Sequence, residues 1–231
     1  MTVGDGSADW LTLADWRRRL AQLYGEVRER AATDPGSAWD HWRATRDELY
    51  RAHPQSPVPA ADRGAFRGNY WPYDAGLRFE VDVAVAAPVV APDATTDAAP
   101  APRDVPSPTI RLSLPMSTGE ALEFTQIAEV RIPFPGRPRT LALFWMAGYA
   151  GGLFLPFRDA TNGASTYGAG RYLLDTAKGA DLGGDPSAGR LVLDFNFAFH
   201  PSCAFDSHWS CPLAPPENRL DLAVEAGERL S

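Results

Sequence analysis

The residues between His200 and Cys211 have the types and spacing that could bind a metal ion. They follow the pattern His200-x2-Cys203-x4-His208-x2-Cys211, which places four nitrogen or sulfur donors within twelve residues. Zn²⁺ binds such donors tetrahedrally, often from short paired spacings on a turn. Zinc is therefore the one cofactor that this segment suggests. The alternatives are a reactive thiol at Cys203 and two cysteines buried as small hydrophobic side chains.

A polar face precedes this segment along the chain. Within residues 190–199, apolar side chains alternate with Asp194 and Asn196, and this period of two predicts a strand. At about 3.3 Å per residue the two polar side chains would lie roughly 7 Å apart on one face. If that face lines a barrel or cleft, Asp194 could act as a general acid or base and Asn196 could bind a ligand. If it faces solvent, neither residue needs a function.

The glycine-rich loop 157–172 carries polar side chains that would either satisfy a buried loop or hold an anionic ligand. The candidates for binding are Asp159, Thr166, Tyr167 and Arg171. Arg171 could clamp an anion, and its structural alternative is an ion pair with Asp159 or Asp194. The loop lacks the Gly-Lys-Ser/Thr sequence of a phosphate loop.

A proline-rich segment at 211–219 could present two further polar groups to the same pocket. Its prolines favour a rigid, extended path. Glu217 is a second candidate general acid or base, and Asn218 is a candidate ligand contact. The structural alternative for Glu217 is capping a helix or bridging to an arginine.

The first 56 residues predict the helices that would support these segments. Leu20, Leu23 and Val27 follow Trp16 at helical spacing, and a second such pattern begins at Trp39 and ends before Pro54. Thr12 and Ser37, each followed three residues later by an aspartate, resemble capping signals for the two helix starts. We expect the tryptophans to pack against the rest of the fold, and ligand stacking is the alternative.

Residues 57–231 change to a period of two. Strand patterns occur at 77–85, 110–114, 121–132, 139–147, 152–157, 170–174, 190–199 and 219–225. Short, closely spaced strands separated by turn residues favour an antiparallel sheet over βαβ units. The fold class is therefore α+β, with an N-terminal helical segment packed on a mainly antiparallel, barrel-like sheet. We expect one domain over 1–231, with a flexible Ala/Pro loop at 86–108.

Composition disfavours some partners and some compartments. The formal net charge is −7, so nucleic acid and anionic membranes are poor partners. The sequence holds no apolar run long enough to cross a membrane, and its first residues do not resemble a signal peptide. The expected location is the cytoplasm, where a structural disulfide between the two cysteines is disfavoured. The oligomeric state stays open.

The segments that carry this chemistry also resemble an uncharacterised bacterial family, domain of unknown function 1684. The resemblance rests on Phe157-Arg158-Asp159, Thr166-Tyr167, Gly170-Arg171-Tyr172, Asp194-Phe195-Asn196, Pro201-Ser202-Cys203-Ala204, Cys211-Pro212, Pro215 to Leu220 and Ala226-Gly227-Glu228. The family more usually has Asn at the position of His200 and does not require His208, which weakens the four-ligand zinc site. The resemblance implies no activity.

Together these patterns predict one pocket for a small polar or anionic molecule. In the catalytic hypothesis the protein is a small-molecule enzyme such as a hydrolase, in which Asp194 or Glu217 acts as acid or base and Cys203 acts as nucleophile or metal ligand. In the alternative hypothesis the same groups only bind the ligand. A protein-interaction module that uses exposed tryptophans and the Ala/Pro segment is a third possibility.

Overall fold

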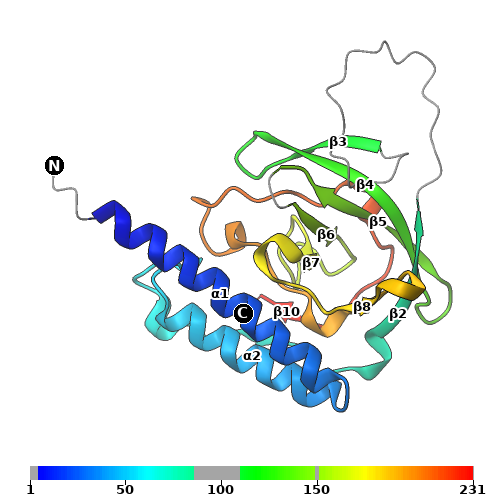
Figure 1. Cartoon of the computed structure of the whole chain (residues 1–231), viewed down its shortest axis with the longest axis horizontal. Coiled ribbons are helices and arrows are strands. Elements are labelled where there is room, and N and C mark those ends of the chain that lie inside the picture. Colours follow the sequence, from blue (N-terminus) through cyan, green and yellow to red (C-terminus); the bar gives the residue numbers. More distant parts are fainter. Residues whose placement is uncertain (1–4, 86–109, 149–150, 231) are drawn as a thin grey trace, which may run out of the picture.

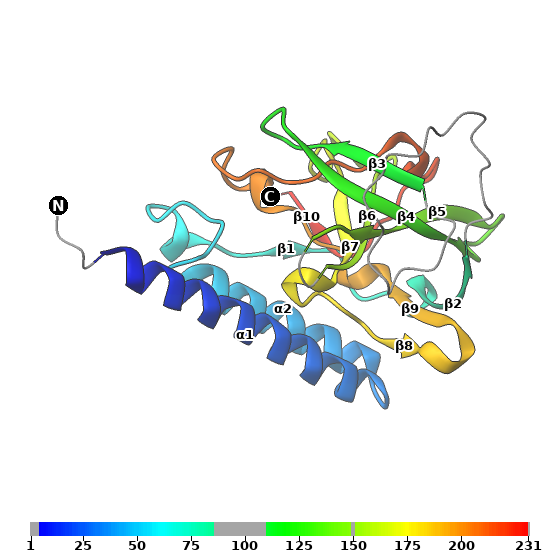
Figure 2. The same ribbon diagram turned by 45° about the horizontal axis from the view of Figure 1, so that its top comes forward.

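Two long helices lie side by side along one side of a curled β-sheet (Figure 1). The computed structural model describes residues 5–85, 110–148 and 151–230. Helix α1 spans Asp5–Ala31, and helix α2 spans Pro35–Ala52 and runs back along it. The Ala/Pro loop that we expected at 86–108 lies outside the described residues. Figure 2 shows the helical pair as a layer against the sheet.

Both helices begin earlier than the capping patterns predicted. Helix α1 begins at Asp5, so Thr12 lies inside it and its hydroxyl donates to the Asp9 carbonyl. Helix α2 has Asp34 as its N-cap, and the Asp34 carboxylate accepts from the Ser37 backbone N–H at 2.9 Å. Pro35 occupies the first turn, where its missing N–H costs no hydrogen bond. The capping patterns therefore placed both helix starts too late, by three residues at α2.

The cap assignment predicts different effects for two neighbouring substitutions. Asp34→Ala should lower the free energy of unfolding by about 1 kcal/mol, since it removes an acceptor for an otherwise unpaired N–H. Ser37→Ala keeps the backbone donor and should change it by less than about 0.5 kcal/mol. Urea unfolding of the two variants measures both. A larger loss for Ser37→Ala than for Asp34→Ala would mean that Ser37 is the cap.

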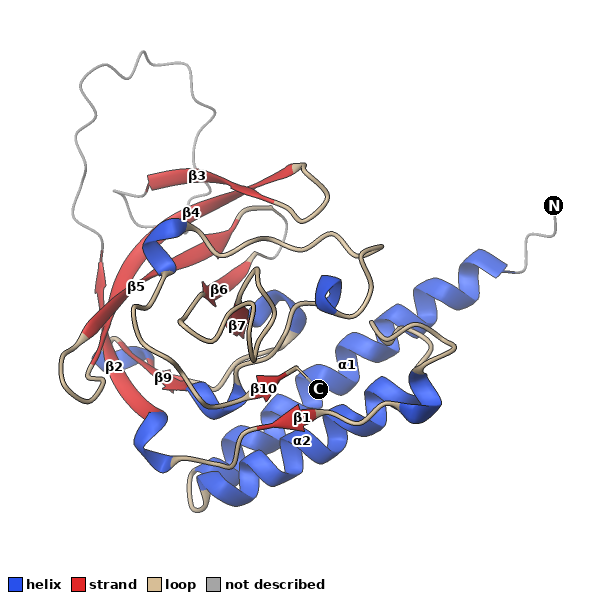
Figure 3. Cartoon of the chain, turned by 180° about the vertical axis from the view of Figure 1, so that it is seen from behind, coloured by secondary structure: helices blue, strands red, loops and turns tan. Residues whose placement is uncertain are grey.

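The sheet is antiparallel throughout its described pairs and curls into a half-barrel. Its order is β7-β6-β5-β4-β2-β9-β8, with β3 also paired to β4, while β1 and β10 form a separate two-stranded ribbon. Figure 3 shows this ribbon beside α2. The strands are β1 (Asn69–Tyr70), β2 (Arg78–Val85), β3 (Ile110–Pro115), β4 (Ala121–Ile132), β5 (Arg139–Met146), β6 (Gly152–Phe157), β7 (Arg171–Asp175), β8 (Gly184–Asp185), β9 (Arg190–Asp194) and β10 (Glu228–Arg229).

Strand β4 explains how the sheet bends. Its first half pairs with β3 and its second half with β2, and the register against β5 shifts between Gln126 and Ala128. Such a bulge increases the local twist of a strand. The curl encloses a core of aliphatic and phenylalanine side chains, among them Val130, Leu141 and Phe195. The α+β architecture with a curled sheet is thus confirmed.

The predicted tryptophan role also agrees with the structure. Trp39 and Trp42 are buried between α2 and the sheet, where they pack with Leu23 and Phe197. The indole N–H of Trp39 donates to the Asn196 carbonyl at 3.0 Å. These aromatics therefore fix the helical pair to the sheet.

Two predicted strands were wrong. The strand expected at 190–199 ends at Asp194, and residues 195–197 form a 3₁₀ helix. Residues 219–225 form no strand. In both places alternating apolar residues are buried by a bent chain rather than by a pleated strand, so the period of two was misleading.

Candidate functional site

Asp194 and Asn196 belong to a buried network that shapes the chain. Asp194 caps the 3₁₀ helix, since its carboxylate accepts from the backbone N–H and the side-chain amide of Asn196 at 3.0 and 2.7 Å. Asn196 in turn bonds both the N–H and the carbonyl of Asp74 at 2.8 Å. Both side chains are fully buried. Burial raises the pKa of Asp194, although the bonds from Asn196 and the nearby Arg78 oppose that shift. The network holds the entry to β2 in place.

Arg171 and Asp159 form a second buried network that fixes the C-terminal segment. The Arg171 guanidinium donates to Asp159 at 2.6 Å and to the carbonyls of Val224, Ala226 and Glu228. Its side chain is completely buried. The Asp159 carboxylate also accepts from the backbone N–H of Thr161. The ion pair that we weighed for Arg171 is therefore the arrangement that the structure has.

Asn218 is a buried structural side chain as well, whereas Glu217 is exposed. The amide of Asn218 bonds the N–H and the carbonyl of Ala142 in β5 and the carbonyl of Pro156 in β6. It therefore closes a gap between two strands and the proline-rich segment. The nominated polar residues thus lie in separate networks, and the cavity and groove described below are not lined by Asp194, Arg171 or Glu217.

The four candidate zinc ligands do not converge either. Within residues 5–85, 110–148 and 151–230, no three His, Cys, Asp or Glu side chains are grouped so that they could hold a metal ion. His208 is exposed, while His200 is buried. The residues Cys203 and Cys211 do lie together, as free cysteines.

His200 is held as a neutral ring beneath the loop 157–172. Its Nε2 accepts from the Tyr167 backbone N–H at 3.2 Å, and its Nδ1 lies 3.8 Å from Glu228. Burial lowers the pKa of His200 to about 4, which outweighs the opposite effect of Glu228. Arg171 and Arg46 add to the lowering. Thr166 and Tyr167 thus take part in hydrogen bonds that hold this loop in place, including one between the Thr166 and Thr161 hydroxyls.

Sequence reasoning missed a buried ion pair between Arg46 and Glu228. The Arg46 guanidinium donates to the Glu228 carboxylate at 2.8 Å, and their side chains are only 6% and 2% exposed. The guanidinium also lies over the rings of Tyr50 and Phe199. One signal was present, since Arg46 occurs four residues after Trp42 and four before Tyr50, on the buried face of α2. A charge at such a position indicates a buried partner.

A small cavity lies next to this ion pair, between the helices and the sheet. Its volume is about 60 Å³. Aromatic and aliphatic side chains from the two helices and from the sheet and its loops form most of its wall, and the polar residues that line it include Arg46, Asp175, Lys178 and Ser202. Lys178 pairs with Asp175 at 3.3 Å and is half-exposed, which marks the side that reaches solvent.

The Arg46 guanidinium is not fully satisfied at this cavity. Its Nε is buried and has no hydrogen-bond partner among the described residues. Burial lowers the pKa of Arg46, but Glu228 and the surrounding tyrosines raise it by a larger amount. The net shift is therefore upward, and the group keeps its charge. A buried cationic donor that lacks an acceptor is costly unless a ligand or water supplies one.

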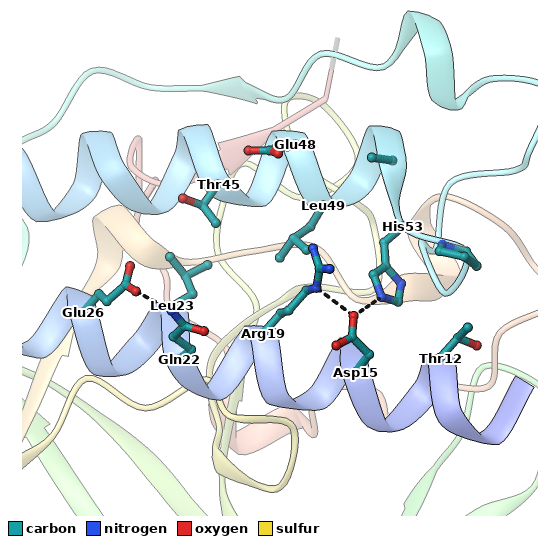
Figure 4. A pocket seen from close by; sticks show the side chains of 12 residues that line it. Thr12, Asp15, Arg19, Gln22, Leu23, Glu26, Thr45, Glu48, Leu49 and His53 are labelled. Carbon is teal, nitrogen blue, oxygen red and sulfur yellow. Dashed lines mark hydrogen bonds and ion pairs between the residues drawn. The ribbon is translucent and has the colours of Figure 1, made fainter. Parts of the chain in front are cut away.

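A larger groove lies on the outer face of the helical pair (Figure 4). Its volume is about 440 Å³, and charged side chains of α1 and α2 line it. Those side chains bind one another: Asp15 accepts from Arg19 at 2.7 Å and contacts His53 at 3.3 Å, and Gln22 donates to Glu26 at 2.9 Å. Most of the charged groups in the groove are therefore already paired with one another.

The fold and site define a class of protein: an α+β protein whose curled antiparallel sheet is closed by buried polar networks and covered on one side by a helical hairpin. The chain belongs to the family of proteins of unknown function DUF1684, whose model matches residues 69–229. The resemblance drawn from sequence motifs is thereby confirmed. The match leaves out both helices.

A solved structure supports the same fold. The solution NMR structure of an uncharacterized protein from Haloarcula marismortui is 30% identical to this chain, with a TM-score of 0.54. The similarity covers 81% of this chain and 90% of that protein. No curated protein matches the chain.

No described helix is apolar over a stretch long enough to cross a bilayer.

Proposed function

We propose that this protein binds a small carboxylate in the cavity beside Arg46, without catalysing its conversion. The observation that carries the proposal is Arg46, which lines an aromatic cavity and whose buried Nε lacks an acceptor among the described residues. Guanidinium groups bind carboxylates through paired N–H donors, and Arg46 uses only its Nη2 on Glu228. A carboxylate oxygen would supply the missing acceptor.

The size and charge of the cavity limit the ligand. A volume of about 60 Å³ is roughly twice what one water molecule occupies in the liquid, so only a compact head group fits inside. The aromatic walls suit a short apolar chain, and Lys178 adds a second positive charge at the open side. Because Glu228 and Asp175 already balance the two cations, we expect modest affinity for one negative charge. We place this binding in the cytoplasm.

Titration with formate, acetate and propionate tests the proposal. A ligand that binds only the folded state raises the melting temperature in a saturable way, by an amount that grows with its concentration over Kd. Propionamide has the same shape without the charge and should stabilise the protein less. Sodium chloride at equal ionic strength controls for screening of surface charges.

A matched pair of substitutions locates the binding site. Ser202 lines the cavity, whereas Ser207 is exposed on the same loop and does not line it. Ser202→Leu should abolish the stabilisation by carboxylate because the larger side chain occupies the cavity. Ser207→Leu should leave the stabilisation unchanged. Equal stabilisation of both variants, or of the wild type by salt alone, contradicts the proposal.

A catalytic function is the second candidate, and Cys203 is the observation that favours it. Its pKa is lowered to about 6, and Ser202 beside it lines the cavity. A nucleophilic thiolate needs such a lowered pKa. If the protein is a hydrolase, Cys203→Ser should abolish turnover in a screen of esters and thioesters, while carboxylate binding at Arg46 persists.

A further inference from the structure

Cys203 and Cys211 form a thiol pair where the loop 202–212 meets the turn between β3 and β4. Both cysteines are free, and they are 7% and 2% exposed. The backbone N–H of Cys203 donates to the Cys211 sulfur at 3.3 Å. The Cys211 sulfur is therefore in direct contact with the backbone of Cys203 in the folded protein.

The two thiols differ in reactivity. The neighbouring Cys211 thiol is the main cause that lowers the pKa of Cys203 to about 6, with Ser117 and Tyr167 adding to the shift and burial opposing it. The pKa of Cys211 is raised, mainly because its proton is held by the Cys203 sulfur. Burial raises the pKa of Tyr167 to about 12, so its hydroxyl stays a donor. Cys203 is also the more exposed of the two, which makes it the attacking sulfur.

We infer that Cys203 and Cys211 are a redox-active dithiol that a hydroperoxide oxidises to an internal disulfide. The Cys203 thiolate attacks the terminal oxygen of the hydroperoxide, the O–O bond breaks, and the alkoxide or hydroxide takes a proton from solvent. Cys203 is then a sulfenic acid. The Cys211 sulfur attacks the Cys203 sulfur and loses its proton, the S–O bond breaks, and water leaves. The cysteines lose two electrons in total, and the hydroperoxide gains them.

The backbone of Cys211 is held in place by the turn between β3 and β4. Ser117 bonds the backbone of Cys211 in both directions, with its N–H to the Cys211 carbonyl at 2.9 Å and its Oγ accepting the Cys211 N–H at 3.0 Å. The loop is thus already fixed to the sheet when the sulfurs react. In a reducing compartment a thiol reductant would return the pair to the dithiol, as expected of a redox-sensing rather than a structural disulfide. This inference does not depend on the proposed carboxylate.

Mass spectrometry of the full chain tests the inference. Protein reduced and freed of reductant should, after treatment with stoichiometric hydrogen peroxide, lose the mass of two hydrogen atoms. Titration of unfolded protein with a thiol reagent should fall from two reactive thiols to none. Peptide mapping should find the cross-link between Cys203 and Cys211 in monomeric protein, and added dithiothreitol should reverse it.

Single substitutions separate the roles of the two sulfurs. Cys211→Ser should form a sulfenic acid at Cys203 that a dimedone reagent traps, because the resolving thiol is missing. Cys203→Ser should react far more slowly with the same peroxide. Tyr167→Phe removes a donor to the Cys203 thiolate, so the thiolate absorbance of Cys203 should appear at higher pH and oxidation near pH 6.5 should slow several-fold.

Three outcomes would overturn the inference. In the first, the wild-type protein keeps two thiols after peroxide treatment while Cys211→Ser accumulates sulfenic acid. In the second, disulfides form only between separate chains. In the third, Cys203→Ser and Cys211→Ser react with peroxide at equal rates. Each of these variants should melt cooperatively, and loss of folding in one leaves the wild-type mapping experiment as the deciding measurement.

Discussion

Arg171→Met is expected to lower the free energy of unfolding by about 3–5 kcal/mol, or to prevent folding at ordinary temperatures. The substitution leaves the buried Asp159 carboxylate without its counter-ion and three carbonyls of the C-terminal segment without their donor. Methionine fills a similar volume, so the loss comes from unpaired polar groups and not from a cavity. Urea unfolding followed by circular dichroism measures the change.

Two further variants control this prediction. Arg219 is exposed and lies in the same C-terminal region, so Arg219→Met should change stability by less than about 0.5 kcal/mol. Asp159→Asn combined with Arg171→Met should cost less than the sum of the two single changes, since the second change removes a charge that the first has left unpaired. If Arg171→Met unfolds like the wild type while a bound ligand no longer stabilises the protein, Arg171 is a binding residue after all.

His200 is expected to make the protein acid-sensitive. Its pKa is 6.5 in an unfolded chain and about 4 in the fold, because burial disfavours the imidazolium. Above pH 6.5 the ring is neutral in both states, and the stability is fully present. As the pH falls from 6.5 to 4, the unfolded chain binds a proton that the fold does not. This difference removes about 3 kcal/mol of stability.

The measurement is the difference between two pH profiles. His200→Asn has no titrating ring at this position, so its stability should fall less steeply between pH 6.5 and pH 4 than that of the wild type. His208→Asn changes an exposed histidine and should keep the wild-type slope. Carboxylates elsewhere affect all three proteins alike and cancel in the comparison. Parallel profiles for the wild type and His200→Asn would show that His200 does not contribute.

How far the sequence predicts this fold depends on the range of the interactions involved. Helical spacing of Trp16, Leu20 and Leu23, and the alternation in 77–85, describe which side of a local element is apolar. The helical pair and most of the large strands could therefore be predicted. The short strands β1, β8 and β10 could not, because two residues carry no period and pair only when the rest of the chain brings them together.

The candidate site was less predictable. Asp194 and Asn196 were expected on a strand face, and the structure has them at a turn, where the Asp194 side chain bonds the chain two residues further on. A local hydrogen bond of this kind competes with strand pairing, and the alternation of residue types in the sequence does not indicate that such a bond forms. The same limitation applies to Asn218, whose three partners lie 62 and 76 positions away in the sequence.

By itself the sequence determined the α+β class, the family, and the segments rich in polar side chains, since each depends on residue types and local spacing. Only the tertiary structure decided which of those side chains are structural and where unsatisfied groups remain, at the Nε atoms of Arg46 and Arg171. Arg46 and Glu228 are 182 positions apart, and Tyr167 and Ser117, which help to lower the pKa of Cys203, lie on other segments. Burial and hydrogen bonding at these residues depend on contacts between distant segments, which local spacing does not specify.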